Sequence, residues 1–585
     1  MDSVLGYLET IWARIAPPFV GTDPNAHGLL GAGHNHLILT ASVTSLATFL
    51  FVIGFGFIPF IGKRLPPGPP RDFKPGFLSR ASSTLPLWRQ FAILQKQYVD
   101  VRILMNHGPG SVVSLFQGRT PVIGAYILMK FLGTIKAATD LLEKKGGIYS
   151  SRPRSIMVGE LLSDGMRGVM MPYGTRWRNW RSVMHAGMSI EASSAYKPLQ
   201  SMESKILLHD LLFESDPAQY FAHLRRFAIS VVLRVSYGRR IQSLDDPIVV
   251  ANTKIEELRE QFQRVFSKLT IMIPDQRFMQ WFRHEPDAQL AHDSELYLSF
   301  ANEVRRQMTL GIALPSTGTR ALEKQEDFGL NDVETAFALS SPFSAGVGTT
   351  LSTLDVFFLA MLHYPQAMKN AQAEIDEVVG RNRLPEFGDA ESLPYTRALI
   401  TETMRWRPIV PLGVPHSVVS DDTYDGMFIP KGSSVYANIS YASHHFNLDV
   451  GRSLIFMFCR YMSKNEEMFP SPEDFRPERY LKSVDHPAPH STFFFGFGRR
   501  ICPGIHIAHN SLFIVVSRLL WAFDILPPLD KDGNVVIPSK DDFTAGLSIR
   551  PKPFIYCLTV RKGEDTVALI KEEWNRAEEE ASAYT

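Results

Sequence analysis

Residues Phe493–Gly504 read FFFGFGRRICPG and place one cysteine, Cys502, in a loop of aromatic residues, glycines and arginines. An apolar run, GIHIAHNSLFIVVSRLL, continues from Gly504 to Leu520 and predicts a helix that begins beside the cysteine. The partial positive charge at a helix N-terminus favours the ionised form of a nearby thiol. The stretch therefore predicts that Cys502 binds a metal, and the iron of a haem suits this loop.

The neighbours of Cys502 each suit such a site. Gly498 and Gly504 let the backbone approach a porphyrin where a side chain would clash, and they allow backbone conformations that other residues resist. The guanidinium of Arg500 can reach a haem propionate, and the ring of Phe495 can shield the sulfur from water. A lone cysteine is more often a small buried hydrophobic residue, but these neighbours favour ligation.

The composition is that of a large globular protein. The chain has 585 residues, 45% hydrophobic and 21% charged, with a net charge of +1. This balance argues against a nucleic-acid surface, which needs a basic face. The three cysteines, Cys459, Cys502 and Cys557, are too few for a disulfide scaffold and have no zinc-type pairing. They indicate a reducing compartment.

The N-terminal region predicts a membrane anchor. Leu37–Ile61 contains no charged residue and is long enough to cross a bilayer as a single helix. A cleaved signal peptide or a buried core helix is the alternative, but the polar residues 1–36 precede this run. Basic residues follow it, so the positive-inside rule places 1–36 in the lumen and the body in the cytosol. Residues 62–75 contain LPPGPP and predict a stiff hinge, and 76–585 form one catalytic body.

The spacing Phe-x-x-Gly-x-Arg-x-Cys-x-Gly around Cys502 is the haem-binding signature of the cytochrome P-450 family. The chain resembles this family, and its fungal microsomal members in particular, over nearly its whole length. The resemblance implies a mainly α fold with a small β region, a bound haem b, and Cys502 as the axial ligand of its iron.

Two further motifs support the resemblance. Glu402 and Arg405 lie three residues apart on a predicted helix, Tyr395–Trp406, a spacing that is usually a surface contact when it occurs alone. Pro477–Tyr480 reads PERY at the place where the family has its Pro-Glu-Arg motif. The resemblance implies that Glu402, Arg405 and Arg479 form an ion network behind the haem.

Upstream, Trp177 and Arg181 match the family's Trp-x-x-x-Arg helix motif. The resemblance implies that the indole N–H and the guanidinium contact one haem propionate, for which an arginine fork is well suited. His416 stands where related enzymes often offer another propionate donor, with an ordinary core or surface histidine as the alternative.

The helix predicted over Asn331 to Leu354 contains AGVGTT at 345–350. This resembles the family's distal helix motif, in which Ala345 and Gly346 would open a notch over the iron and Thr349 would hydrogen-bond oxygen. A packing or kink feature is the alternative. Gly348 stands where the motif carries a carboxylate, so the usual acid for proton delivery is missing.

Three segments exceed the family's usual length. Ser440 to Met462 is the longest and contains the apolar run LIFMFC at 454–459, while shorter surpluses occur at 99–107 and 124–131. An exposed loop with such an apolar run is an aggregation liability. Retained introns and genuine surface loops are both compatible with these segments, and an in-frame mature transcript would exclude the introns.

The resemblance implies a monooxygenase that inserts one oxygen atom from O₂ into an apolar organic substrate. Electrons would come from NADPH through a separate flavin-containing reductase, with cytochrome b5 as a further candidate partner. The enzyme would lie in the endoplasmic reticulum membrane, in contact with lipid, and serve secondary metabolism or xenobiotic oxidation. The loop Met157–Met171 would contribute to its apolar pocket. Alternatives are a haem-thiolate enzyme that uses or rearranges peroxides, and a catalytically impaired haem-binding protein.

Overall fold

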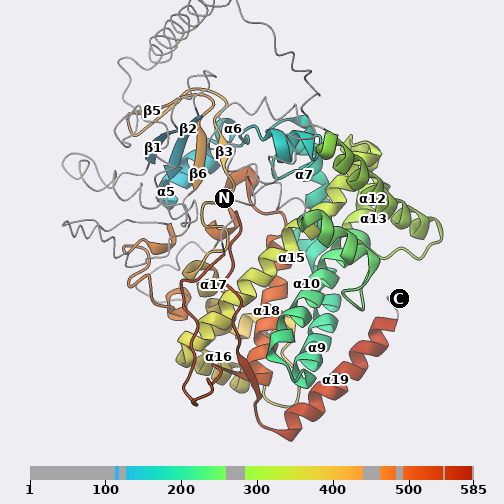
Figure 1. The fold of residues 1–585 in the computed structure, drawn as a ribbon, viewed down its shortest axis with the longest axis vertical. Coiled ribbons are helices and arrows are strands. Elements are labelled where there is room, and N and C mark those ends of the chain that lie inside the picture. The colour runs from blue at the N-terminus through green and yellow to red at the C-terminus, as the bar shows by residue number, and fades with distance from the viewer. Residues whose placement is uncertain are drawn as a thin grey trace, which may run out of the picture. The chain divides into compact units, whose positions relative to one another are not determined.

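The computed structural model describes most of the body after residue 111 (Figure 1). For 112–117 and 127–132 it describes the backbone alone. Backbone and side chains are described for 134–257, 284–437, 439, 462–481, 492–544 and 547–582, except the side chains of 284–285. All of them belong to the unit Lys63–Thr585. The predicted anchor, its flanking segment, the hinge, the surplus at 99–107, residues 440–461 and Cys459 lie outside the described residues.

Helices make up most of the described chain, as the sequence predicted. The longer ones are α7 (Thr175–Met188), α9 (Lys197–Phe213), α10 (Tyr220–Tyr237), α12 (His284–Thr309), α15 (Asp332–His363), α16 (Pro365–Val378), α17 (Pro394–Trp406), α18 (Ile505–Ala522) and α19 (Glu564–Ser582). Shorter helical pieces are α5 (Ile135–Ala138), η2 (Thr139–Lys144), α6 (Gly146–Tyr149), η3 (Ile156–Leu161), α8 (Ile190–Ser194), η4 (Pro217–Gln219), α13 (Thr317–Glu323), α14 (Gln325–Phe328), η6 (Phe387–Ser392), η7 (Met462–Lys464), η8 (Pro477–Tyr480), η9 (Phe493–Phe495) and η10 (Gly498–Arg500).

The β region is small. One sheet has the order β1–β2–β6–β3, with strands Val112–Gln117, Ile127–Leu132, Ser434–Ala437 and His416–Ser417. Two further strand pairs are antiparallel, β4 (Asp422–Tyr424) with β5 (Met427–Ile429) and β7 (Phe523–Leu526) with β8 (Cys557–Val560). Most of the surplus at 124–131 therefore forms β2, which pairs with β1 and β6, so this part is a strand and not a loop.

Helix α15 forms the centre of the helical part and packs against α10 and α12 (Figure 1). Asn331 caps its N-terminus by accepting from the backbone N–H of Glu334, whose carboxylate accepts in return from the N–H of Asn331. Helices α15 and α18 are both apolar and long enough to cross a membrane, but most of each apolar window is buried inside the protein. They are core helices, which place the distal helix motif and the cysteine loop in one folded body.

Candidate functional site

The cysteine loop joins η10 to α18. The backbone N–H of Cys502 donates to the carbonyl of Phe495 at 2.9 Å, which closes the loop on itself. Gly504 is the N-cap residue of α18, and its N–H hydrogen-bonds the cysteine sulfur. The ring of Phe495 packs against that of His509, with centroids 5.0 Å apart. The sulfur thus lies at the start of α18, as the sequence predicted.

Opposing effects act on the pKa of the Cys502 thiol. Burial raises the pKa of Cys502 and outweighs the Gly504 N–H and the Arg181 guanidinium, which both lower it. The contribution of the helix N-terminus to the ionisation of the sulfur remains a prediction. A metal ion bound to the sulfur would deprotonate it, because a coordinating thiol loses its proton to the cation.

Gly498 adopts a backbone conformation that other residues resist, as the sequence predicted. Its φ is 55°, and a Cβ built there would lie 2.3 Å from the carbonyl oxygen of Leu142. The backbone of η2 therefore excludes a side chain at this position. At Gly504 the nearest described atom to such a Cβ is the Met188 sulfur at 3.9 Å, so described protein atoms leave room there.

Replacing Gly498 with alanine should destabilise the fold by more than about 2 kcal/mol, because it combines a left-handed φ with a backbone clash. Urea unfolding followed by circular dichroism measures the change. Gly147→Ala is the control, since a Cβ at Gly147 meets nothing within 4 Å. Equal midpoints for the two variants would contradict this account.

Three arginine guanidiniums near the cysteine loop lack a carboxylate partner among the described residues. Arg152 and Arg500 are buried, Arg181 is half-buried, and all three donate to backbone carbonyls. Burial lowers the pKa of Arg152 to about 9, and burial together with the guanidiniums of Arg152 and Arg181 lowers that of Arg500 to about 9. Buried charge without a counter-charge is costly, so this cluster suits an anion.

Each guanidinium is held firmly. The acceptors of Arg500 are the carbonyls of Ser150 at 2.7 Å, Met171 at 2.6 Å and Gly168 at 3.2 Å. Those of Arg152 are the carbonyls of Val169 at 3.1 Å, Val414 at 2.7 Å and Pro415 at 2.8 Å. Arg152 belongs to no motif in the sequence. Only the return of the chain at Val414–Pro415 places it beside the cysteine loop.

Helix α7 brings Trp177 and Arg181 to the same place. Arg181 Nη1 donates to the carbonyl of Ile501 at 2.7 Å, next to Cys502. The ring of Trp177 lies under the Arg500 guanidinium, 4.2 Å from it, and its indole N–H has no hydrogen-bond acceptor among the described residues. One turn of α7 therefore presents a cation and a free N–H donor beside the cysteine.

His416 lies at the edge of this cluster on β3. Its Nδ1 is 2.8 Å from the carbonyl of Tyr149, so Nδ1 carries the proton. Burial, with Arg152 and Arg500 nearby, lowers the pKa of His416 to about 3 and keeps the ring neutral. A contact between His416 and a haem propionate remains a prediction from the family.

These residues fit a haem. The donor set offers one sulfur for iron, three guanidiniums and one free indole N–H for two carboxylates, and a glycine with room beside it. Cys502 would hold the iron, and Arg152, Arg181, Arg500 and Trp177 would face the propionates. The chemistry of the donors, more than any single residue, defines the site as that of a haem-thiolate protein.

The distal motif lies in the middle of α15. Thr349 Oγ1 donates to the carbonyl of Ala345 at 2.6 Å, which leaves its lone pairs free to accept a hydrogen bond. Ala345 and Gly348 are exposed, although most of the helix is buried, and a Cβ at Gly348 would meet nothing within 4 Å. At Gly346 a Cβ would lie 2.8 Å from Val232 of α10, so Gly346 allows close packing of α15 against α10, and its part in a notch over the iron remains a prediction.

The structure contains the ion pairs among Glu402, Arg405 and Arg479 that the family motifs imply. Glu402 and Arg405 are both fully buried, and Arg405 donates from Nε and Nη2 to the two carboxylate oxygens at 2.7 Å each. Arg479 Nε donates to Glu402 Oε1 at 3.2 Å, and the backbone N–H of Arg476 adds a bond of 2.8 Å. Remaining Arg405 protons bind the carbonyls of Ser463, Pro472 and Asp474. This network ties α17 to the segment around η8.

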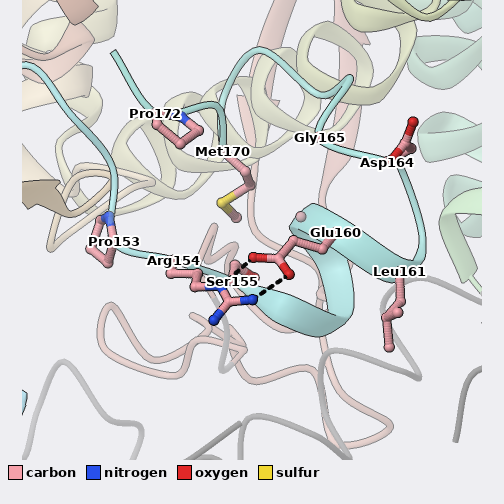
Figure 2. Close-up of a pocket in the computed structure, with 10 residues that line it drawn as sticks. Pro153, Arg154, Ser155, Glu160, Leu161, Asp164, Gly165, Met170 and Pro172 are labelled. Carbon is pink, nitrogen blue, oxygen red and sulfur yellow. Dashed lines mark hydrogen bonds and ion pairs between the residues drawn. The ribbon is translucent and has the colours of Figure 1, made fainter. Parts of the chain in front are cut away.

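A separate cavity of about 410 Å³ lies beside the loop Met157–Met171 (Figure 2). Leu161, Met170 and the ion pair of Arg154 with Glu160, bonded at 2.5 and 2.9 Å, lie around it. Neither Cys502 nor Thr349 lines this cavity.

Comparison with known proteins places the chain in a family. The cytochrome P-450 family model matches residues 84–448 and 451–558, so the chain belongs to the cytochrome P-450 family, and its relatives are named as monooxygenases. It is 37% identical to cytochrome P-450 monooxygenase 58 of Postia placenta over 79% of this chain and 84% of that one. It is 34% identical to the monooxygenase verL of Clonostachys rogersoniana over 78% and 82%.

Solved structures support the fold. A zebra fish cytochrome P-450 structure with progesterone matches with a TM-score of 0.63 at 23% identity, over 82% of this chain and 100% of that one. A second, with abiraterone, matches with a TM-score of 0.60 at 23% identity, over 77% and 96%. The mainly α fold with small sheets is therefore confirmed as the cytochrome P-450 fold.

Proposed function

We propose that this monooxygenase binds haem b through Cys502 and inserts one oxygen atom from O₂ into an apolar organic substrate, reducing the other to water. Electrons come from NADPH through a separate reductase, with cytochrome b5 as a further candidate donor. The observation that carries the proposal is the sulfur of Cys502 beside three guanidiniums without carboxylate partners. Haem, when bound, supplies oxygen activation.

The protein's own groups have three tasks in this reaction. The guanidiniums of Arg152, Arg181 and Arg500 offset the propionate charges, and the indole N–H of Trp177 orients one of them. The Thr349 hydroxyl accepts a hydrogen bond from water, because its own proton is held by the Ala345 carbonyl. At Gly348 no side chain supplies a proton, so water or another acid must do so.

We propose that the substrate is apolar. The exposed Ala345 and Gly348 of α15, with Met157–Met171 and the segment after Arg405, offer mainly apolar side chains. This composition is compatible with a role in secondary metabolism or xenobiotic oxidation. A spectral screen of substrate binding with purified protein tests it, and a preference for charged ligands would contradict it.

We also propose that Leu37–Ile61 anchors the enzyme in the endoplasmic reticulum membrane with its body in the cytosol. The uncharged apolar run and the basic residues after it support this topology. Protease protection of microsomes tests it, because a cytosolic body should be digested without detergent. Release of the protein by alkaline carbonate would contradict an integral anchor.

Reconstitution with reductase separates the two candidate reactions. Product formation that requires NADPH, reductase and O₂ supports the monooxygenase. Product formed equally well from hydrogen peroxide alone would favour the peroxide-using alternative, which the missing acid at Gly348 motivates. A ferrous carbon monoxide spectrum without the thiolate Soret band would indicate an impaired protein.

Introducing an acidic residue in place of Gly348 should improve proton delivery. Gly348→Glu has space for the new side chain, and we expect a larger share of consumed NADPH to appear as product, because a general acid typically accelerates proton transfer by roughly 10²–10⁴-fold. Gly348→Ala is the control, because it changes helix propensity by about 0.5–1 kcal/mol without adding an acid. The measurement is the amount of product and of hydrogen peroxide formed per NADPH consumed. An equal yield of product per NADPH in the two variants would contradict the role of the missing acid.

A further inference from the structure

Helix α19 follows the part of the chain that the family match covers, which ends at residue 558. It packs along α9 (Figure 1), and its buried Ala577 and Ala581 contact an apolar face of that helix. This face of α9 consists of Leu199, Met202 and Ile206, with Trp574 packed against the same cluster. The two helices therefore share a small apolar interface.

Polar contacts fix the register of that interface. Lys205 of α9 pairs with Glu573 of α19 at 2.7 Å, and both side chains are nearly buried. The ring of Trp574 stacks on His209, with centroids 4.1 Å apart and planes 12° from parallel. Contacts of this kind, mostly removed from water, resist salt screening better than exposed pairs.

The adjoining side of α9 contacts α18, the helix that follows Cys502. Gln200 is fully buried, and its Nε2 donates to the carbonyl of Ile507 at 3.1 Å and to Ser511 Oγ at 2.8 Å. Its Oε1 has no hydrogen-bond partner, so these two bonds are what holds the buried amide in place. Arg518 of α18 adds bonds of 2.6 Å to Ser201 and Ser204 of α9.

We propose that Gln200 is a positioning residue that fixes the first turn of α18, and with it the Cys502 loop, and that α19 holds α9 where Gln200 can make these bonds. Ile507 lies in the first turn of α18, five residues after Cys502. A shift of α9 by about 1 Å would lengthen both bonds past the usual hydrogen-bond range. The inference rests on the proposed ligation of haem iron by Cys502.

The first test separates positioning from general stability. Gln200→Met keeps the size of the side chain and removes both donors. Gln372→Met is the matched control, because Gln372 of α16 is also buried and its Nε2 donates to the Phe523 carbonyl at 3.1 Å and to Asp524 at 3.0 Å, on β7. Both variants should unfold at similarly lowered temperatures.

Only Gln200→Met should alter the haem signature. We expect its haem to transfer to apomyoglobin roughly fivefold faster, an effect equivalent to one of the two lost hydrogen bonds, and its ferrous carbon monoxide band to shift more readily from the thiolate to the thiol position. Equal haem transfer in the two variants, or no change in Gln200→Met, would overturn the positioning role.

The second test addresses α19. Ala577→Asp places a charge in the α9 interface, whereas Ala568→Asp places the same charge on the exposed side of α19. Amide hydrogen exchange should rise along α19 and α9 only in Ala577→Asp, and haem transfer should accelerate with it. If Ala577→Asp fails to fold, Trp574→Ala takes its place, since it removes the stack on His209. Faster exchange of α19 with unchanged haem transfer would overturn the link from α19 to Cys502.

If Cys502 does not bind haem iron, the experiments give a different result from the one expected when only the positioning role of Gln200 fails. If the unmodified protein shows no thiolate band, or keeps it in Cys502→Ser, the ligand assignment fails, whatever the behaviour of α19. Hydrogen exchange on the same samples reports the α19–α9 contact independently of haem.

Discussion

Replacing Cys502 with serine should abolish the thiolate Soret band of the ferrous carbon monoxide complex and reduce oxygenation to background. A serine hydroxyl does not supply the electron-rich sulfur that favours O–O cleavage, so the loss of activity should be complete within detection. Carbon monoxide difference spectra and product assays with reductase measure both effects.

Cys557→Ser is the matched control. Cys557 lies on β8 and, like Cys502, is a free cysteine. Its replacement should leave the band and the turnover unchanged. A thiolate band that survives in Cys502→Ser but disappears in Cys557→Ser would refute the assignment of the ligand.

Removing the charge of Glu402 should destabilise the fold by about 3–5 kcal/mol. Glu402→Ala leaves Arg405 buried and without its carboxylate, and a buried charge stripped of its partner carries a penalty of that size. Arg479 and the Arg476 N–H lose the same acceptor. Chemical unfolding and the haem content of purified protein give the result.

The control lies on the neighbouring stretch of chain. Glu391 pairs with Arg397 at 3.0 Å, but both side chains are largely exposed. Glu391→Ala should therefore change stability little, because exposed ion pairs contribute little. A loss as large in Glu391→Ala as in Glu402→Ala would show that burial does not govern the network.

Local patterns in the sequence were enough to predict several parts of the molecule. The helix after Gly504 was predicted to Leu520 and ends at Ala522, and the helix with Glu402 begins within one residue of its predicted start. The distal helix was predicted to Leu354 but continues to His363, because its apolar C-terminal half is core. Periodicity and capping act over one or two turns, so the sequence displays them directly.

Contacts between segments that are distant along the chain could not be predicted from the sequence. Arg152 has no motif and reaches the site only because its guanidinium binds carbonyls at Val414 and Pro415, more than 250 residues away. Gln200 likewise carries no pattern. The close approach of Gly346 to Val232 and of Gly498 to the Leu142 carbonyl likewise follows from no spacing rule.

The sequence by itself determined the family, the cysteine that would hold iron, and the missing acid at Gly348, because these depend on residue types at short, fixed spacings. The tertiary structure decided how the charges around that cysteine are balanced. It gathers Arg152, Arg181 and Arg500 where no described carboxylate pairs with them, leaves the thiol with a raised pKa, and sets α19 behind α9. Burial and electrostatic balance depend on which distant segments exclude water together, and only the folded chain defines that.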